Sequence, residues 1–232
     1  MDRKTNKINF KKFFLNIIMP SVISIFLFIF LIFWYIIPYF ESSMLNSKKE
    51  MIRELVSTAS NIAEKNYLDF KSGKFTSEQE AKEDAINKIS ALRYGFDNKD
   101  YFFITDNTPT MIMHPYRPDL NGENLSQHKD PNGKKLFVEM VKVVKKSGSG
   151  YVDYKWQWMD DSSRIVQKIS FVKEVKGWGW IVGTGIYIED IKEKIANIEQ
   201  ELIYVSIVIT FLIAVLIIII VIQNLKSEIK RN

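Results

Sequence analysis

The sequence predicts an α+β protein, an antiparallel sheet of about five strands with a long N-terminal helix, flanked by two transmembrane helices. Two charge-free apolar windows, Ile17–Ile37 and Leu202–Ile222, hold 21 residues each. A helix of that length spans about 30 Å, the apolar thickness of a bilayer. Between the windows the apolar period is helical at first and strand-like later. The 161 residues Glu41–Glu201 suffice for one domain with its own core.

Charge indicates the orientation in the membrane. We expect a cytoplasmic N-terminus (1–16), a first span (17–40), an outer domain (41–201), a second span (202–223) and a cytoplasmic tail (224–232). The N-terminal segment carries a net charge of +4, the tail +2 and the remainder −1. Cytoplasmic flanks of membrane helices are enriched in Lys and Arg, so both ends are predicted inside and the domain outside. The basic excess therefore belongs to the membrane flanks and does not indicate a nucleic-acid partner.

Two further properties narrow the function. The first window could be a signal peptide, but its apolar core is too long and no small-residue cleavage site follows Pro38, so we expect a retained anchor. The chain has no Cys and two His, His114 and His128. Disulfides, thiolate nucleophiles and Cys-based metal sites are excluded, and we predict no cofactor and no metal.

The first outer segment predicts a long helix. No Gly or Pro occurs from Glu41 to Phe70, and apolar residues recur with a period near 3.5 at Leu45, Ile52, Leu55, Ala59 and Ile62. Such a seam either covers a sheet or joins two copies of the chain. We expect both, on different faces of the helix, and therefore a homodimer.

A second helix is predicted from about Ser77, a suitable N-cap, with Ala81, Ala85, Ile89 and Leu92 on its inner side. Arg93 follows Ile89 by four residues and is expected beside that stripe. A guanidinium there either meets an anionic partner inside the domain or extends to solvent at the helix end.

The rest of the domain reads as strands with one helix. A hairpin is predicted from 101–105 and 110–114 around the turn 106–109, and a helix from 134–146. Three strands follow at 150–158, 165–175 and 178–188, and a charged linker at 189–201 leads into the second span.

Several segments together resemble the single Cache domain of bacterial membrane receptors. They are YGFDNKDYFFITD (94–106), MIMHP (111–115), NGENL (121–125), DPNGKKLF (130–137), GSGYVDYKW (148–156) and KISFVKEVKGWGWIVGTGIYIEDI (168–191). The resemblance covers about Asn66 to Ile191, and the flanking pair of spans is also usual for that family.

The resemblance implies a PAS-like antiparallel sheet whose pocket binds a short carboxylate such as pyruvate, acetate, propionate or lactate. It also implies an inner-membrane, two-pass protein with a periplasmic or extracellular sensor domain. Relatives act in chemotaxis or two-component signalling, through cytoplasmic modules. Only ten residues follow Ile222, so we expect the signalling module in the rest of a longer chain or in a separate protein.

A carboxylate pocket must replace water with fixed donors. An Arg fork, Tyr hydroxyls, a His N–H and a Lys ammonium meet that need. The predicted ligand-binding residues are Arg93 as the main anion contact, then Tyr101, His114, Trp156, Lys168 and Tyr187. Lys168 could equally face solvent from its strand, and Trp156 and Tyr187 could be plain core. His128 is expected to be a solvated surface residue.

The sequence also bears on two other functions, catalysis and ligand-free interaction. The paired acids Asp160 and Asp161 lie in a turn, and the chain lacks the GxSxG, phosphate-loop and HExxH motifs, so no enzyme is predicted. The alternative to a receptor is a membrane-anchored interaction module that has this fold but no small-molecule ligand.

Overall fold

The computed structural model describes residues 14–231, and the chain divides into two units. One unit holds the segments up to Ser43 and from Lys192, and the other is the sensor unit Met44–Ile191. Most of the predicted cytoplasmic N-terminus, residues 1–13, lies outside the described residues.

Within the described residues, two helices are long and apolar enough to cross a membrane, by length and composition, namely Met19–Lys71 and Ile188–Gln223. The first is built from α2 (Met19–Leu31), a π-helical turn (Ile32–Ile36) and α3 (Ile37–Lys71), after a π-helical turn at Phe14–Ile18. Large apolar side chains such as Phe26, Trp34 and Phe211 are exposed along these helices, as suits lipid contact.

The second long helix, α6 (Ile188–Arg231), begins directly after the last strand. The predicted charged linker at 189–201 is itself helical and forms the first part of α6. It contains no Gly or Pro, and its Lys, Glu, Ala and Ile residues favour a helix.

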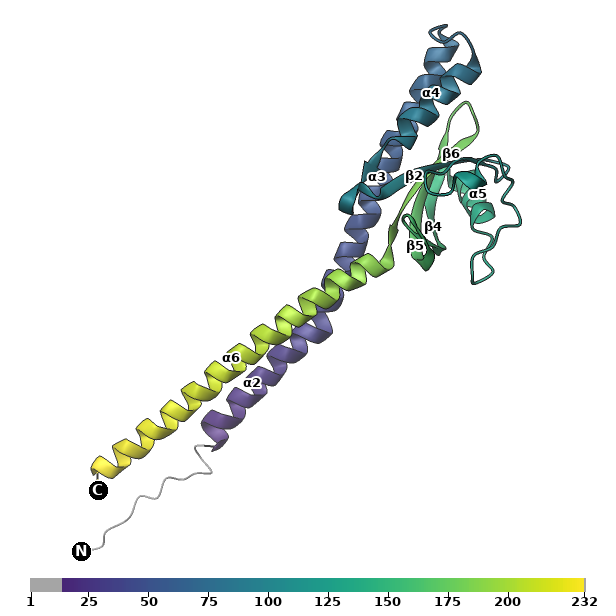
Figure 1. Ribbon diagram of the computed structural model, residues 1–232. Coiled ribbons are helices and arrows are strands. Elements are labelled where there is room, and N and C mark those ends of the chain that lie inside the picture. The colour runs from purple at the N-terminus through teal and green to yellow at the C-terminus, as the bar shows by residue number, and fades with distance from the viewer. Residues whose placement is uncertain (1–13, 232) are drawn as a thin grey trace, which may run out of the picture. The chain divides into compact units, whose positions relative to one another are not determined.

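The sensor unit contains a six-stranded antiparallel sheet, with strand order β1-β2-β6-β5-β4 and β3 paired to β2. The strands are β1 (Arg93–Tyr94), β2 (Asp100–Asp106), β3 (Met111–Met113), β4 (Ser149–Trp158), β5 (Asp161–Val175) and β6 (Trp180–Tyr187). The predicted hairpin and the three C-terminal strands are confirmed, and the short β1 is an addition. Figure 1 shows α3 and α5 on opposite sides of the sheet.

Helix α3 turns one side into the domain. Ile52, Val56, Ala59 and Ala63 are fully buried, and the Tyr67 ring packs edge-on against Trp178, 5.8 Å between centroids. The predicted seam is therefore divided. Ile52 and Ala59 belong to the core of the sensor unit, whereas Leu45, Leu55 and Ile62 are only partly buried.

Helix α4 (Glu78–Ser90) has the predicted N-cap, since the Ser77 hydroxyl accepts a hydrogen bond from the Glu80 amide. Its buried face is Ala81, Ala85 and Ile89, as expected. The buried Asn66 of α3 joins the two helices, because its amide donates to the Ala81 carbonyl at 3.0 Å.

Helix α5 (Leu136–Ser147) closes the other side of the sheet and confirms the helix predicted at 134–146. It ends at Gly148, whose φ of 73° is the left-handed conformation favoured by glycine at helix ends. Its buried side chains join those of β2, β4, β5 and β6 in the main core cluster; they are Leu136, Phe137, Met140, Val141 and Val144.

Candidate functional site

Five of the six predicted site residues meet in the core between the sheet and α5. Tyr101 comes from β2, His114 follows β3, Trp156 lies on β4, Lys168 on β5 and Tyr187 on β6. The Tyr101 and His114 rings lie 4.8 Å apart between centroids, and His114 and Trp156 5.7 Å. Strand register produces the cluster, since Lys168 is paired directly with Tyr187.

Lys168 is the cation of the cluster and is only 1% exposed. The alternative that it faces solvent is therefore wrong. Its face of β5, with Val166, Ser170 and Val172, is the buried one. The Lys168 Nζ donates to the hydroxyls of Tyr101 at 2.9 Å and Tyr187 at 3.2 Å. No carboxylate oxygen within residues 14–231 forms an ion pair with it at 4.0 Å or less.

Burial lowers the pKa of Lys168 to about 7, and the charge of Asp100 opposes this shift. Asp100 is partly buried at the start of β2. Burial raises the pKa of Asp100 to about 6, and Lys168 acts in the opposite direction. The two groups therefore both titrate near neutral pH, because each is removed from water without a close partner.

The phenols beside Lys168 stay protonated. Burial raises the pKa of Tyr101 and of Tyr187 well above the ordinary value. The Tyr187 hydroxyl also accepts a hydrogen bond from the Met159 amide at 2.9 Å. On the neighbouring strand the Tyr154 hydroxyl is hydrogen-bonded to the Ser170 hydroxyl at 2.8 Å.

His114 is held as a neutral donor. Its Nδ1 accepts hydrogen bonds from the amides of Tyr116 at 3.2 Å and Arg117 at 3.0 Å, so the proton belongs on Nε2. Burial lowers the pKa of His114 to about 3, and the charges of Lys168 and Arg117 act in the same direction. The imidazole thus supplies an N–H without a charge across the neutral pH range.

A small cavity lies within this cluster. It measures about 10 Å³, which is room for about one water molecule. Its lining is aromatic and apolar apart from a few hydroxyl and imidazole groups; the residues are Tyr101, Phe103, His114, Leu136, Phe137, Tyr154 and Trp156. A ligand of several heavy atoms requires these side chains to move apart.

His128 is not the solvated surface residue that the sequence suggested. Its ring packs against Phe137 and Trp156, at 5.6 and 5.7 Å between centroids, and is partly buried. It covers two of the aromatic side chains of the cavity wall from the loop that precedes α5.

Arg93 lies elsewhere than predicted. Helix α4 ends at Ser90, so Arg93 stands on β1, opposite Tyr101. Its guanidinium donates to the carbonyls of Ser90 and Leu92, at 2.5 and 2.8 Å, and lies 5.8 Å from the centre of the Tyr116 ring. These contacts satisfy carbonyls at the end of α4, where a cation is favourable.

The sequence did not indicate several side chains of this candidate site. Tyr154 alternates with Trp156 on the buried face of β4, which was a usable signal. Asp100 directly precedes a predicted strand, and nothing in the sequence marked it as partly buried. Phe103 of β2 and Phe137 of α5 read in the sequence as core side chains, and only the fold shows that they line a cavity.

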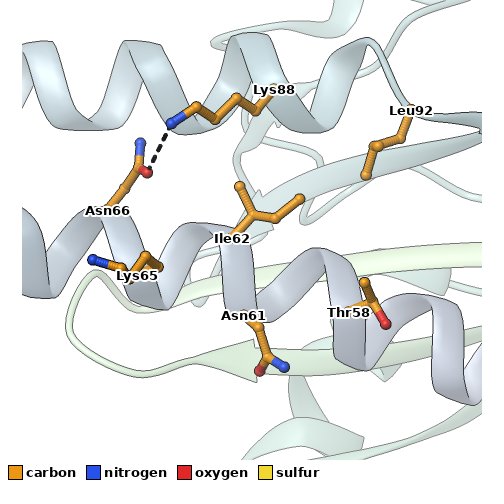
Figure 2. A pocket seen from close by; sticks show the side chains of 7 residues that line it. All are labelled: Thr58, Asn61, Ile62, Lys65, Asn66, Lys88 and Leu92. Carbon is orange, nitrogen blue, oxygen red and sulfur yellow. Dashed lines mark hydrogen bonds between the residues drawn. The ribbon is translucent and has the colours of Figure 1, made fainter.

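A larger groove of about 570 Å³ lies between α3 and α4 (Figure 2). Its lining residues are Thr58, Asn61, Ile62, Lys65, Asn66, Lys88 and Leu92. The Asn66 side chain already has partners on both sides. Its amide nitrogen donates to the Asp84 carboxylate, and its amide oxygen accepts from Lys88 Nζ at 3.4 Å. This groove is open, so it is less suited than the buried cluster to stripping water from a small anion.

The comparisons with known proteins agree with this architecture. The Cache domain family model matches residues 32–206. The methyl-accepting chemotaxis protein McpP of Pseudomonas putida is 34% identical over 180 residues, which cover 78% of this chain and 32% of that protein. The sensor histidine kinase MctS of Rhizobium johnstonii is 34% identical over 155 residues, covering 67% of this chain and 32% of that protein. The chain thus spans about a third of the length of these relatives.

Two solved structures are similar as well. A periplasmic sensor domain of a chemotaxis protein is 41% identical with a TM-score of 0.59, covering 62% of this chain and 97% of that one. A Cache chemosensory domain, described for its carboxylic acid recognition, is 40% identical with a TM-score of 0.58, covering 63% and 97%. With its long N-terminal helix, antiparallel sheet and matching family model, the chain belongs to the Cache domain family.

Proposed function

We propose that the chain is a membrane-anchored extracytoplasmic sensor that binds a small monocarboxylate beside Lys168 and transmits a signal across the membrane. The observation that carries the proposal is a buried lysine that borders an aromatic cluster. Among residues 14–231, its hydrogen-bond partners are phenols and include no carboxylate. A buried cation without a close counter-ion is unfavourable, and an anionic ligand would supply that counter-ion.

The groups of the cluster have complementary roles in this proposal. Lys168 supplies the charge, the hydroxyls of Tyr101 and Tyr187 and the N–H of His114 supply directional donors, and Trp156 forms a wall. All these donors are fixed by strands or by backbone hydrogen bonds, which limits the entropy lost on binding.

The apolar lining favours a ligand with a short hydrocarbon end. The cavity holds about one water molecule, so a larger ligand must displace side chains that line it, such as Leu136 and Phe137 of α5. This supports short acids such as acetate, propionate, pyruvate or lactate. The solved Cache domain described for carboxylic acid recognition supports the same class.

The signal leaves through α6, which begins at the residue after Tyr187. We propose a two-pass inner-membrane protein with the sensor unit outside, as in the similar periplasmic sensor domain. The similar chemotaxis protein and histidine kinase support a cytoplasmic signalling module, in the same full-length chain or in a separate protein. Association as a homodimer is part of the proposal, and catalysis by this chain is not.

Calorimetry on the full chain in detergent micelles tests the proposal. We expect acetate, propionate, pyruvate or lactate to bind the wild type and to raise its melting temperature with concentration. Lys168→Met should weaken binding at least roughly tenfold, as expected for loss of a charge-assisted contact. Lys173→Met is the matched control, because Lys173 lies on the opposite face of the same strand.

Failure of all short acids to bind the folded wild type would favour an interaction module without a small ligand. The role of Arg93 as main anion contact stays a prediction that Arg93→Ala tests. A loss of about 2–3 kcal/mol in binding would put its guanidinium at the ligand. Unchanged affinity would leave it with the carbonyls at the end of α4.

A further inference from the structure

Building on the proposed function, we infer that the site takes up a proton when it binds a carboxylate, so that ligand and pH are sensed together. The geometry of Lys168 carries this inference. Its Nζ contacts two phenol oxygens, and an amine can donate both hydrogen bonds in the neutral as well as in the charged form. Because the amine is almost fully buried and no carboxylate among residues 14–231 forms an ion pair with it, removal from water favours the neutral form before the ligand arrives.

The groups around Lys168 leave few alternatives for the proton. Tyr101 from β2, Tyr187 from β6 and Tyr154 from the paired position on β4 are buried phenols that stay protonated. His114, after β3, stays neutral because of its burial. From the same strand, Ser170 contributes only a hydroxyl.

Asp100 is the carboxylate whose charge acts on Lys168 from β2. Asp100 is itself influenced by Lys48 of α3 and by Asp190 in the first turn of α6. It makes no ion pair with Lys168 among the described residues. Lys168 and Asp100 are thus the two groups of this cluster that can change charge near neutral pH.

The sign of the effect follows from the two titrations. The pKa of Lys168 is lowered to about 7, so above that pH the amine is increasingly neutral in the free protein. A bound carboxylate stabilises the ammonium and raises its pKa, so binding above pH 7 draws in a proton. Asp100, with its pKa raised to about 6, contributes uptake in the same direction at lower pH.

The expected change of carboxylate affinity with pH is large. Affinity for the carboxylate should fall modestly between about pH 6 and 7, where Asp100 contributes to the uptake, and roughly tenfold per pH unit above about pH 8. A lysine with an ordinary pKa would stay charged, and affinity would not change over this range.

The experiment is calorimetry of propionate binding to the full wild-type chain at pH 6, 7, 8 and 9. Each pH is measured in two carboxylate-free buffers of different protonation enthalpy. We expect proton uptake that approaches one per site at pH 9, together with the loss of affinity. Equal affinity at pH 6 and pH 9, without uptake, would overturn the inference while leaving carboxylate binding intact. Absence of propionate, acetate, pyruvate and lactate binding at every pH would instead overturn the proposed function, and the inference with it.

Two variants identify the group that takes up the proton. Lys168→Arg keeps its charge at pH 9, so wherever this variant binds propionate the high-pH loss should vanish. Asp100→Asn keeps Lys168 but removes the charge that raises its pKa. The loss of affinity should then begin at a lower pH than in the wild type. The same high-pH loss in Lys168→Arg would exclude Lys168 as the group that takes up the proton.

Discussion

At the scale of single residues, the burial of Lys168 in the candidate site lowers the stability of the folded domain. Lys168 occupies a core position where an apolar side chain would remove the desolvation penalty of an ammonium. Its hydrogen bonds to Tyr101 and Tyr187 offset only part of that penalty. Residues retained at such a cost are typical of functional sites.

This conflict predicts how stability depends on pH. The pKa of Lys168 is about 7 in the folded state and near its ordinary 10.5 in the unfolded chain. The unfolded state therefore binds more protons between these values, and the wild type should gain stability as pH rises from 7 to about 10. Lys168→Met should melt at a higher temperature than the wild type at pH 7, and the difference should shrink toward pH 10.

Scanning calorimetry of the full chain without ligand measures both curves. Lys173→Met should follow the pH dependence of the wild type, because Lys173 is partly exposed. Parallel curves for the wild type and Lys168→Met would show that the pKa of Lys168 is not lowered by folding.

At the scale of elements, β6 connects the site to α6. Tyr187 ends β6, contacts Lys168, and accepts a hydrogen bond from the Met159 amide in the turn between β4 and β5. Met159 has a φ of 50°, an unfavourable value for a residue with a side chain. The neighbouring Trp158 indole donates to the carboxylate of Asp190 in the first turn of α6, at 3.0 Å. A change at Lys168 can thus reach the start of α6 through these hydrogen bonds.

Tyr187→Phe tests this connection. Loss of the hydroxyl leaves the buried Met159 amide without its partner, so amide hydrogen exchange over residues 157–160 should rise at least roughly tenfold. Tyr154→Phe is the matched control, because the hydrogen-bond partner of its hydroxyl within the described part of the chain is the Ser170 side chain rather than a backbone group. Equal exchange in the two variants would remove Tyr187 from the connection.

Helix α3 offers a second prediction at this scale. Ile52 and Ala59 face the core of the sensor unit, whereas Leu55 and Ile62 are partly exposed and available to a second copy. The chain has no Cys, so single cysteines can be introduced cleanly. Leu55→Cys and Ile62→Cys should form disulfide-linked dimers in membranes under mild oxidation, and Ile52→Cys and Ala59→Cys should not. Dimers at all four positions, or at none, would contradict a homodimer through this face.

At the scale of the whole molecule, charge predicts the membrane topology. The net charges of +4, −1 and +2 along the chain predict both ends inside and the sensor unit outside. In intact cells, a membrane-impermeant thiol reagent should label Ser162→Cys, in the exposed β4–β5 turn region, and should not label Ser227→Cys. The reverse labelling pattern would overturn the predicted orientation.

Much of the fold was predictable because its signals are local. The type and spacing of neighbouring residues predict most of its elements. These are the two apolar windows, the N-cap at Ser77, the hairpin around 106–109 and the three C-terminal strands. Errors arose where a local pattern ended. The apolar stripe of the predicted helix continues in the sequence past Ser90, so Arg93 was expected on that helix. The helix ends at Ser90, before Arg93.

By itself, the sequence determined the two long apolar helices and the antiparallel α+β domain, and it named most of the polar side chains that the fold brings together beside Lys168. Hydrophobic period, turn residues and recognisable segments carry that information along the chain. Only the tertiary structure decided that Lys168 is buried, that Asp100 influences it and that Arg93 binds the end of α4. These properties depend on the pairing of β5 with β4 and β6 and of β1 with β2. Strand pairing sets which residues lose water and which charges face one another, and no local pattern specifies it.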